Sequence, residues 1–328
     1  MSCIENINRY IFPNDVINSL TNIYKYIGKN DLYQEITVGS MNKIVEQTIQ
    51  RDAFFLGKIL KIEISDTRLR LIITKNSTPR NKEENTLFTI LEILNDIQTT
   101  YKKYSLQSTS LLNMINYIYE NQSIKFDNRT DLPFGPKDKR EFVDYLSNEL
   151  ETQDDVEKIT LYLNYFIDMY NAKPFTSNND TLTYLVLYIV LLKANIDAFK
   201  YISLFEMIYN DFDDFKAKLL DASYNWREGI SQPTTFIRYM LKLIIASYRK
   251  ADGIITEYKI DQNITKCDNI ENTIYSLPNI FTKDQIRADH PYVSETTINR
   301  ALQKLRDENK IKPLGKGRSA KWIKISLL

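Results

Sequence analysis

The scarcity of residues that bend or end a helix limits most strongly what this chain can fold into. Only 8 glycines and 9 prolines occur among 328 residues, and long stretches contain neither. Glycine and proline are the strongest local markers of turns, so a chain this poor in them favours helices joined by short connections. Hydrophobic residues make up 43% of the chain, which is enough to bury a sizeable core. A chain of this length is typical of two or three domains.

Apolar residues recur at helical spacing along most of the sequence, as Val16, Leu20 and Ile23 do. This pattern predicts helices over residues 15–27, 38–61, 87–104, 111–120, 139–150, 156–170, 181–194, 205–222 and 235–250. The most apolar stretch, residues 182–192, is too short for a membrane span and indicates a buried core helix. We therefore expect a mainly α fold, with strands limited to residues 123–136 and to the C-terminal end.

Composition excludes several classes of site. Two cysteines, Cys3 and Cys267, and one histidine, His290, are too few and too scattered for a zinc site or a disulfide framework. We therefore expect a reducing, cytoplasmic location. Residues 1–10 carry no hydrophobic core of a signal peptide, and no membrane association is expected. The 43 basic and 42 acidic residues leave a net charge of +1, so any nucleic-acid surface must be local.

The C-terminal residues 276–328 have the pattern of a winged helix-turn-helix. Ser294 is a suitable N-cap for a helix whose apolar residues, Ile298 to Leu305, form one buried stripe. A glycine-tipped hairpin follows. Residues 251–275 are polar and weakly patterned, which predicts a linker before this module.

Charge supports duplex DNA as the partner of this module. From residue 290 onward nine basic residues stand against three acidic ones, a local excess of positive charge. The second helix of such a module enters the major groove. We expect base edges to be approached by Thr296, Thr297, Asn299, Arg300 and Gln303. We expect phosphates to be approached by Lys304, Lys316, Arg318 and Lys321. The alternative is a module that only packs against a protein partner or a second copy.

A further resemblance lies in the central part of the chain. A helix is followed by the loop Lys173-Pro174-Phe175-Thr176-Ser177-Asn178-Asn179-Asp180, and then by the apolar helix. This order resembles the Fic (Fic/Doc) family, in which a helix leads into the loop H-P-F-x-D/E-G-N-G-R-x-x-R. Residues 199–204 and 235–240 resemble two later segments of that family. The resemblance implies a Fic-like helical bundle over residues 106–250, with a small flap hairpin near residues 124–136, after an N-terminal helical region over residues 1–105.

Fic proteins transfer a nucleotide, usually AMP from ATP, to a hydroxyl group of a protein. The resemblance implies a role for each motif position: the histidine is the base, the acid holds Mg²⁺, the glycines wrap the phosphates and the arginines bind phosphate oxygens. In this chain Lys173 replaces the histidine and Ser177 the acid. The two glycines are replaced by Asn178 and Asp180, and the two arginines by Thr181 and Tyr184. Only Pro174, Phe175 and Asn179 match.

The matching positions are structural and the replaced ones are chemical, so the motif predicts a pseudoenzyme without a metal or cofactor. Residues 51–61 resemble the family's inhibitory helix, with Leu60 at the position of its glutamate and Leu56 at that of its serine. Glu63 lies near enough to supply a carboxylate if the register slips. The absence of both an inhibitor and its target arginine is consistent with a chain that has no activity to restrain.

Three functions remain open. The first is a catalytically degenerate Fic-like protein that acts as a DNA-binding regulator through its winged helix. The second is a protein-binding pseudoenzyme, or an antitoxin-like partner, that does not bind DNA. The third is a residual AMP transferase with a rewired pocket. Binding to duplex DNA separates the first from the second, and nucleotide binding separates both from the third.

Overall fold

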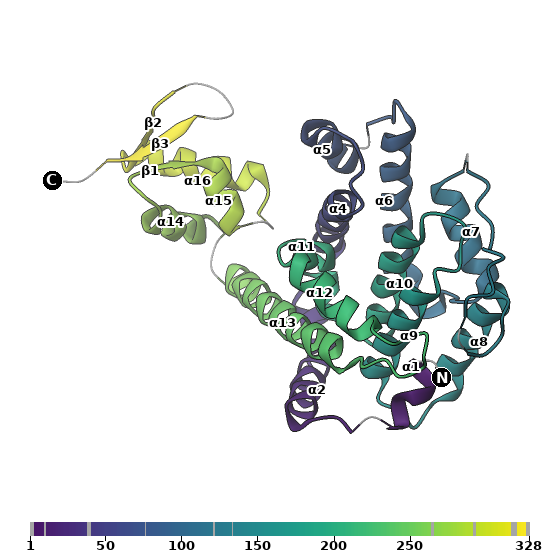
Figure 1. Cartoon of the computed structure of the whole chain (residues 1–328). Coiled ribbons are helices and arrows are strands. Elements are labelled where there is room, and N and C mark those ends of the chain that lie inside the picture. Colours follow the sequence, from purple (N-terminus) through teal and green to yellow (C-terminus); the bar gives the residue numbers. More distant parts are fainter. Residues whose placement is uncertain are drawn as a thin grey trace. The chain divides into compact units, whose positions relative to one another are not determined.

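The computed structural model (Figure 1) describes residues 3–9, 11–37, 41–75, 77–120, 122–132, 134–263, 266–290, 293–315 and 320–325. The chain divides into two compact units. The larger unit contains residues 1–30 and 44–251, and the smaller one residues 31–43 and 252–328. Among the described residues no helix is both long and apolar enough to cross a bilayer.

The larger unit is built of helices, which confirms the prediction of a mainly α chain. Its elements are α1 (Cys3–Asn6), η1 (Ile7–Arg9), α2 (Asn14–Ile27), most of α4 (Met41–Ile59), α5 (Asp66–Lys75), α6 (Lys82–Thr100), η2 (Tyr101–Lys103), α7 (Ser108–Ile118), α8 (Lys139–Thr152), α9 (Lys158–Ala172), α10 (Asn179–Lys193), η3 (Asp197–Lys200), α11 (Leu204–Tyr209), α12 (Phe212–Ser223) and the first part of α13 (Thr234–Asn263).

Helices α9 and α10 form the centre of the larger unit, where they pack against each other. Residues Leu185 to Leu192 of α10 are all completely buried, as expected of a helix that is apolar on every side. On α9, Tyr165 and Phe166 are also completely buried. The loop that joins these two helices is therefore fixed at both ends by the most buried part of the unit.

The smaller unit combines helices with one sheet. The helices are α3 (Asn30–Thr37), the end of α13, α14 (Lys266–Ser276), α15 (Lys283–Asp289) and α16 (Glu295–Asp307). The first residue of α3, Asn30, still belongs to the larger unit. The strands β1 (Ile280–Thr282), β2 (Ile311–Pro313) and β3 (Lys321–Lys324) form an antiparallel sheet in the order β1-β3-β2. Phe281 and Trp322 are partners in register, and both belong to a core shared with Ile298, Leu302 and Leu305 of α16.

The flap hairpin is the first prediction that the structure corrects. Within residues 122–132 and 134–136 no hairpin forms. Instead Phe126 makes a single antiparallel bridge with Phe175. This segment therefore pairs with the loop before α10 rather than with itself. Pro136 has no N–H group to contribute to a ladder, and Gly135 has the positive φ of 62°, so neither residue supports a second strand.

Two further corrections concern the C-terminal part. Residues 251–275, which we interpreted as a linker, are helical where they are described, because α13 continues to Asn263 and α14 begins at Lys266. The segment is polar but contains no proline and only one glycine, Gly253, so nothing in it stops a helix. The strand β1 was not predicted either, because three residues are too few to show a period of two.

Candidate functional site

The motif loop, which we define as residues 173–181, depends on two left-handed backbone positions. Lys173 ends α9 with φ 45° and ψ 66°, and its N–H donates to the carbonyl of Met169. Asn178 stands immediately before α10 with φ 57° and ψ 27°. Asparagine adopts this conformation more readily than most residues with a side chain, so Asn178 supplies a backbone shape for which glycine is the usual choice.

The three residues that match the family motif hold the loop in shape. The Asn179 side chain binds both backbone groups of Phe175, since its Oδ1 accepts from the Phe175 N–H (3.0 Å) and its Nδ2 donates to the Phe175 carbonyl (2.7 Å). The Phe175 ring is buried and lies 5.0 Å from the ring of Phe126. Pro174, the residue before Phe175, is also buried. These contacts fix the conformation of the loop.

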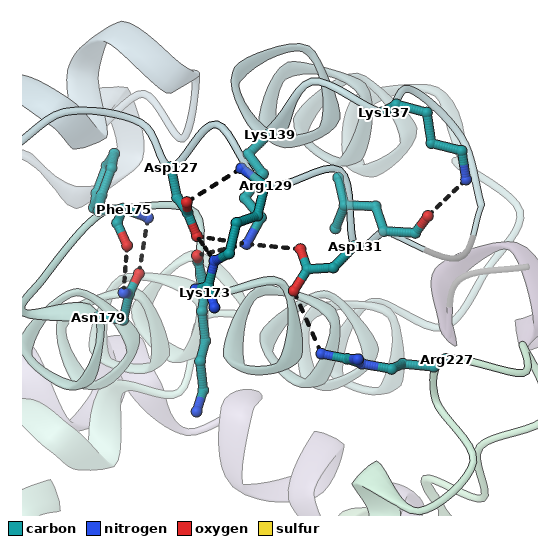
Figure 2. A network of polar contacts seen from close by, with 10 residues as sticks. Asp127, Arg129, Asp131, Lys137, Lys139, Lys173, Phe175, Asn179 and Arg227 are labelled. Atoms are coloured by element: carbon teal, nitrogen blue, oxygen red, sulfur yellow. Dashed lines mark hydrogen bonds and ion pairs between the residues drawn. The ribbon is translucent and has the colours of Figure 1, made fainter.

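The residues that the resemblance aligns with the family's catalytic positions differ in exposure. Lys173, Ser177 and Asp180 are exposed, and the Lys173 side chain points away from the neighbouring polar network (Figure 2). Thr181 is buried, and its hydroxyl lies 2.7 Å from that of Tyr119. Within the described part of the chain, no three His, Cys, Asp or Glu side chains are grouped as metal ligands would be.

Tyr184, at the position of the second arginine, is packed among aromatic rings. Its ring centroid lies 6.3 Å from those of Phe205 and of Phe215. Burial raises the pKa of the Tyr184 hydroxyl, and the nearby Asp180 carboxylate adds to that shift. A neutral phenol therefore stands at the position that the resemblance aligns with the second arginine of the family motif.

The flap segment, residues 123–136, is attached to the motif loop by backbone and side-chain contacts. The Asp127 N–H donates to the Pro174 carbonyl (2.9 Å), and the Thr176 N–H donates to the Lys125 carbonyl (3.0 Å). Lys139, at the start of α8, is 2% exposed and reinforces this contact (Figure 2).

The Lys139 ammonium group joins the flap segment to the end of α9. Its Nζ lies 3.2 Å from Asp127 Oδ2 and 3.0 Å from Asp131 Oδ1, and it donates to the Lys173 carbonyl at 3.3 Å. Burial opposes the ionisation of Asp127, but Arg129 and Lys139 outweigh it and keep the pKa of that carboxyl below its usual value. Sequence reasoning missed this network, because no local spacing links Lys139 to the carbonyl of residue 173.

A cleft of about 330 Å³ lies near the motif loop, although no residue of that loop lines it. Two of its lining residues reach that loop: Tyr119 contacts Thr181, and Gln122 Oε1 accepts from Asn178 Nδ2 at 2.7 Å. The lining residues are Lys61, Ile62, Glu63, Lys82, Glu83, Asn85, Thr86, Ile118, Tyr119, Glu120 and Gln122. Three carboxylates against two ammonium groups give the lining no positive excess that would attract a phosphate.

The segment that resembles the inhibitory helix corresponds to part of α4. Leu56 is completely buried, and Leu60 follows the last residue of the helix. Glu63 lies in the lining of the cleft. Arg51, at the start of this segment, forms a bidentate ion pair with Glu206 of α11.

The residues predicted to contact DNA have different surroundings. On α16, Thr296, Asn299, Arg300 and Gln303 are exposed. Thr297 is half-buried, and its N–H donates to the hydroxyl of the N-cap Ser294 at 3.2 Å. The predicted phosphate-binding Lys304 forms an ion pair with Glu271 of α14 at 3.3 Å. Lys321 is exposed on β3. Lys316 and Arg318 lie outside the described residues.

Comparison with known proteins identifies the fold through solved structures, whereas comparison of the sequence gives no match. The sequence matches no protein-family profile and no curated protein. Among solved structures the chain is similar to a Fic family protein from Desulfovibrio desulfuricans G20, with a TM-score of 0.57 at 12% identity, over 97% of this chain and 98% of that one.

Two other Fic structures match over a smaller share of the chain. Fic-1 from C. elegans gives a TM-score of 0.55 at 15% identity, over 72% of this chain and 71% of that one. A Fic domain containing signaling protein from Bacteroides thetaiotaomicron gives 0.56 at 14% identity, over 73% of this chain and 98% of that one. Since the matches to these structures extend over nearly three quarters of the chain or more, the chain has the fold of the Fic family.

Proposed function

We propose that this chain is a Fic-like protein without nucleotidyl transfer activity, and that it acts as a DNA-binding regulator through a C-terminal winged helix. The observation that carries the proposal is the contrast between two surfaces. The motif loop carries Lys173 and Ser177 where the family has its base and its metal-binding acid, whereas α16 presents an exposed polar face on a separately packed module.

The start of α10 supports the loss of transfer activity. A helix N-terminus normally favours an anion, because its first N–H groups and the helix dipole point toward it. Here Asp180, in the first turn of α10, supplies a carboxylate of its own. That charge satisfies the helix dipole and repels an incoming phosphate. The base and metal positions, Lys173 and Ser177, carry neither a histidine nor an acid.

The C-terminal module supports DNA binding by its arrangement. Helix α15 begins after a capping box formed by Thr282 and Gln285, and α16 follows it with Ser294 as its N-cap. Strands β2 and β3 then form the hairpin that a winged helix requires after its second helix. Helix α16 presents its buried residues to the module core and its polar residues to solvent, as a helix that reads the major groove does.

The DNA proposal is tested by fluorescence anisotropy with labelled duplexes of random and of genomic sequence at two salt concentrations. We expect binding that weakens as salt rises, with a log–log slope of about −0.9 for each phosphate contacted. Arg300→Ala should reduce the preference among duplexes. The DNA proposal is abandoned if neither duplex binds at the lower salt concentration.

The loss of transfer activity is tested with labelled ATP and Mg²⁺ in the presence of candidate protein targets, together with titration calorimetry. We expect neither labelled protein nor measurable heat of Mg·ATP binding. Transfer that Lys173→Ala abolishes would instead support a residual AMP transferase with a rewired pocket.

One observation favours the second candidate, a protein-binding module. On the sheet face opposite the module core, Ile280 of β1 and Ile323 of β3 are cross-strand partners, and Ile280 is half exposed. Leu314 and Ile325, next to the same sheet, are also exposed. An apolar sheet face of this kind is suited to contact with a partner or a second copy.

A further inference from the structure

One stripe of α16 carries groups that match the edges of particular bases. Thr296, Asn299, Arg300 and Gln303 occur at positions i, i+3, i+4 and i+7, which lie on one face of a helix. All four are exposed. The stripe therefore presents a hydroxyl, two carboxamides and one guanidinium group side by side.

The long polar side chains of this stripe have no partner in the part of the chain that the structure describes. The side chains of Asn299, Arg300 and Gln303 form no hydrogen bond or ion pair with any residue that the structure describes. Their end groups would therefore reach a ligand without first breaking a contact within the protein.

The cations at the C-terminal end of α16 are engaged instead. Lys304 and Lys310 both form ion pairs with Glu271, at 3.3 Å and 2.8 Å. Arg306 forms an ion pair with Asp307 at 3.0 Å. The central stripe therefore differs from this end of the helix: its groups are uncommitted and mostly uncharged, which suits recognition of bases better than attraction to phosphates.

The chemistry of the three uncommitted groups points to purines. A carboxamide can donate to N7 of adenine and accept from the N6 amino group of the same base, whereas a guanidinium group donates to both O6 and N7 of guanine. We infer that α16 selects duplexes by the major-groove edges of purines, adenine through Asn299 and Gln303 and guanine through Arg300. This inference rests on the proposed DNA binding and names what is read.

The length of the stripe limits the recognised sequence. A helix rises by about 1.5 Å per residue, so the seven steps from Thr296 to Gln303 span roughly 10 Å. Base pairs in a duplex are about 3.4 Å apart. One copy of the module therefore reads about three or four consecutive base pairs, among which adenines and a guanine are required.

The experiment uses the full chain and a duplex selected from a randomised pool. Competition assays compare that duplex with copies in which adenine or guanine in the selected core is replaced by its 7-deaza analogue, which lacks the N7 acceptor. For the unmodified protein we expect each replacement to weaken binding by about tenfold to a hundredfold. Arg300→Ala should lose only the sensitivity to 7-deazaguanine. Asn299→Ala and Gln303→Ala should lose the sensitivity to 7-deazaadenine.

Two controls accompany these variants. Arg306→Ala removes a cation that is paired with Asp307 and should leave all sensitivities to 7-deaza bases unchanged. Analogues placed outside the selected core should have no effect. Because the substituted side chains are exposed, the far-UV circular dichroism of every variant should match that of the unmodified protein.

The outcomes distinguish this inference from the proposed function. If the chain binds duplexes but 7-deaza bases in the core leave affinity unchanged, purine recognition by α16 is wrong and DNA binding stands. If selection yields no preferred core, the inference is equally refuted. If the chain binds no duplex at all, the proposed function fails and the inference fails with it.

Discussion

Asp52 is a completely buried carboxyl group on α4, and it fixes that helix to the start of α11. It accepts hydrogen bonds from the Ser203 hydroxyl (2.7 Å), the Phe205 N–H (3.0 Å) and the Tyr188 hydroxyl (3.1 Å). Burial raises its pKa to about 7, although these three donors favour the ionised form. Removal from water is therefore the larger effect at this residue.

The raised pKa of Asp52 predicts a pH-dependent stability. The folded state holds the Asp52 proton more tightly than the unfolded chain does, so this contribution is complete below about pH 4 and is lost as pH rises through about 7. Asp52→Asn cannot titrate. The free energy of unfolding of the unmodified protein, relative to Asp52→Asn, should therefore fall by about 1.4 kcal/mol per pH unit in this window.

Urea denaturation of both proteins at several pH values between 4 and 8 measures this difference. The subtraction removes the titration of all other groups that the two proteins share. A difference that stays constant over this range would show that the Asp52 carboxyl ionises with an ordinary pKa.

Lys139 is the residue on which the docking of the flap segment depends most. Lys139→Met keeps the length of the side chain but leaves the carboxylates of Asp127 and Asp131 without their buried partner. We expect the free energy of unfolding to fall by about 2–4 kcal/mol, because Asp127 and Asp131 would keep only their exposed partners, Arg129 and Arg227, and would lose the buried one. Arg129→Met is the matched control. The Arg129 side chain is 69% exposed, so its loss should cost less than about 1 kcal/mol. Equal losses in chemical denaturation would contradict this account.

At the scale of elements, the connection between α9 and α10 depends on backbone conformation at Asn178. Asn178→Gly and Asn178→Val both lose the hydrogen bond to Gln122, so they differ mainly in how well they adopt a positive φ. The Asn178→Val variant should be less stable than the Asn178→Gly variant by about 1–2 kcal/mol, because the valine Cβ clashes with the backbone in the left-handed region. Thermal denaturation of the two variants tests this, and equal midpoints would show that the loop relaxes to another conformation.

Elements with a long apolar period were predictable, and those set by distant contacts were not. Helix α10 followed from its run of apolar residues, and α2 from the spacing of Val16, Leu20 and Ile23. The bridge between Phe126 and Phe175 could not be predicted, because it joins residues 49 positions apart in the chain. For the same reason the sequence identified the residues of the motif loop but not the carboxylates that anchor the flap segment beside it.

At the scale of the whole molecule, the C-terminal module has a hydrophobic core of its own. That core includes Phe281, Leu302 and Trp322, and all its members lie between residues 270 and 322. We expect Leu302→Ala to lower the stability of this module by about 2–5 kcal/mol and to leave the larger unit unaffected.

The two tryptophans allow this to be measured, since Trp226 belongs to the larger unit and Trp322 to the smaller one. In a Trp322→Phe background, fluorescence reports only on the larger unit. Its unfolding midpoint should not move when Leu302→Ala is added, whereas circular dichroism should show an earlier loss of helix. A joint shift of both signals would show that the units unfold together.

The packing around Tyr184 also limits which substitutions the start of α10 would tolerate. An arginine at position 184 would have to displace an aromatic ring that lies against Phe205 and Phe215, and one at position 181 would be buried beside the Tyr119 hydroxyl. Each substitution would place a guanidinium group among packed side chains and would destabilise the fold. The packing at the start of α10 therefore restricts which residues positions 181 and 184 can carry.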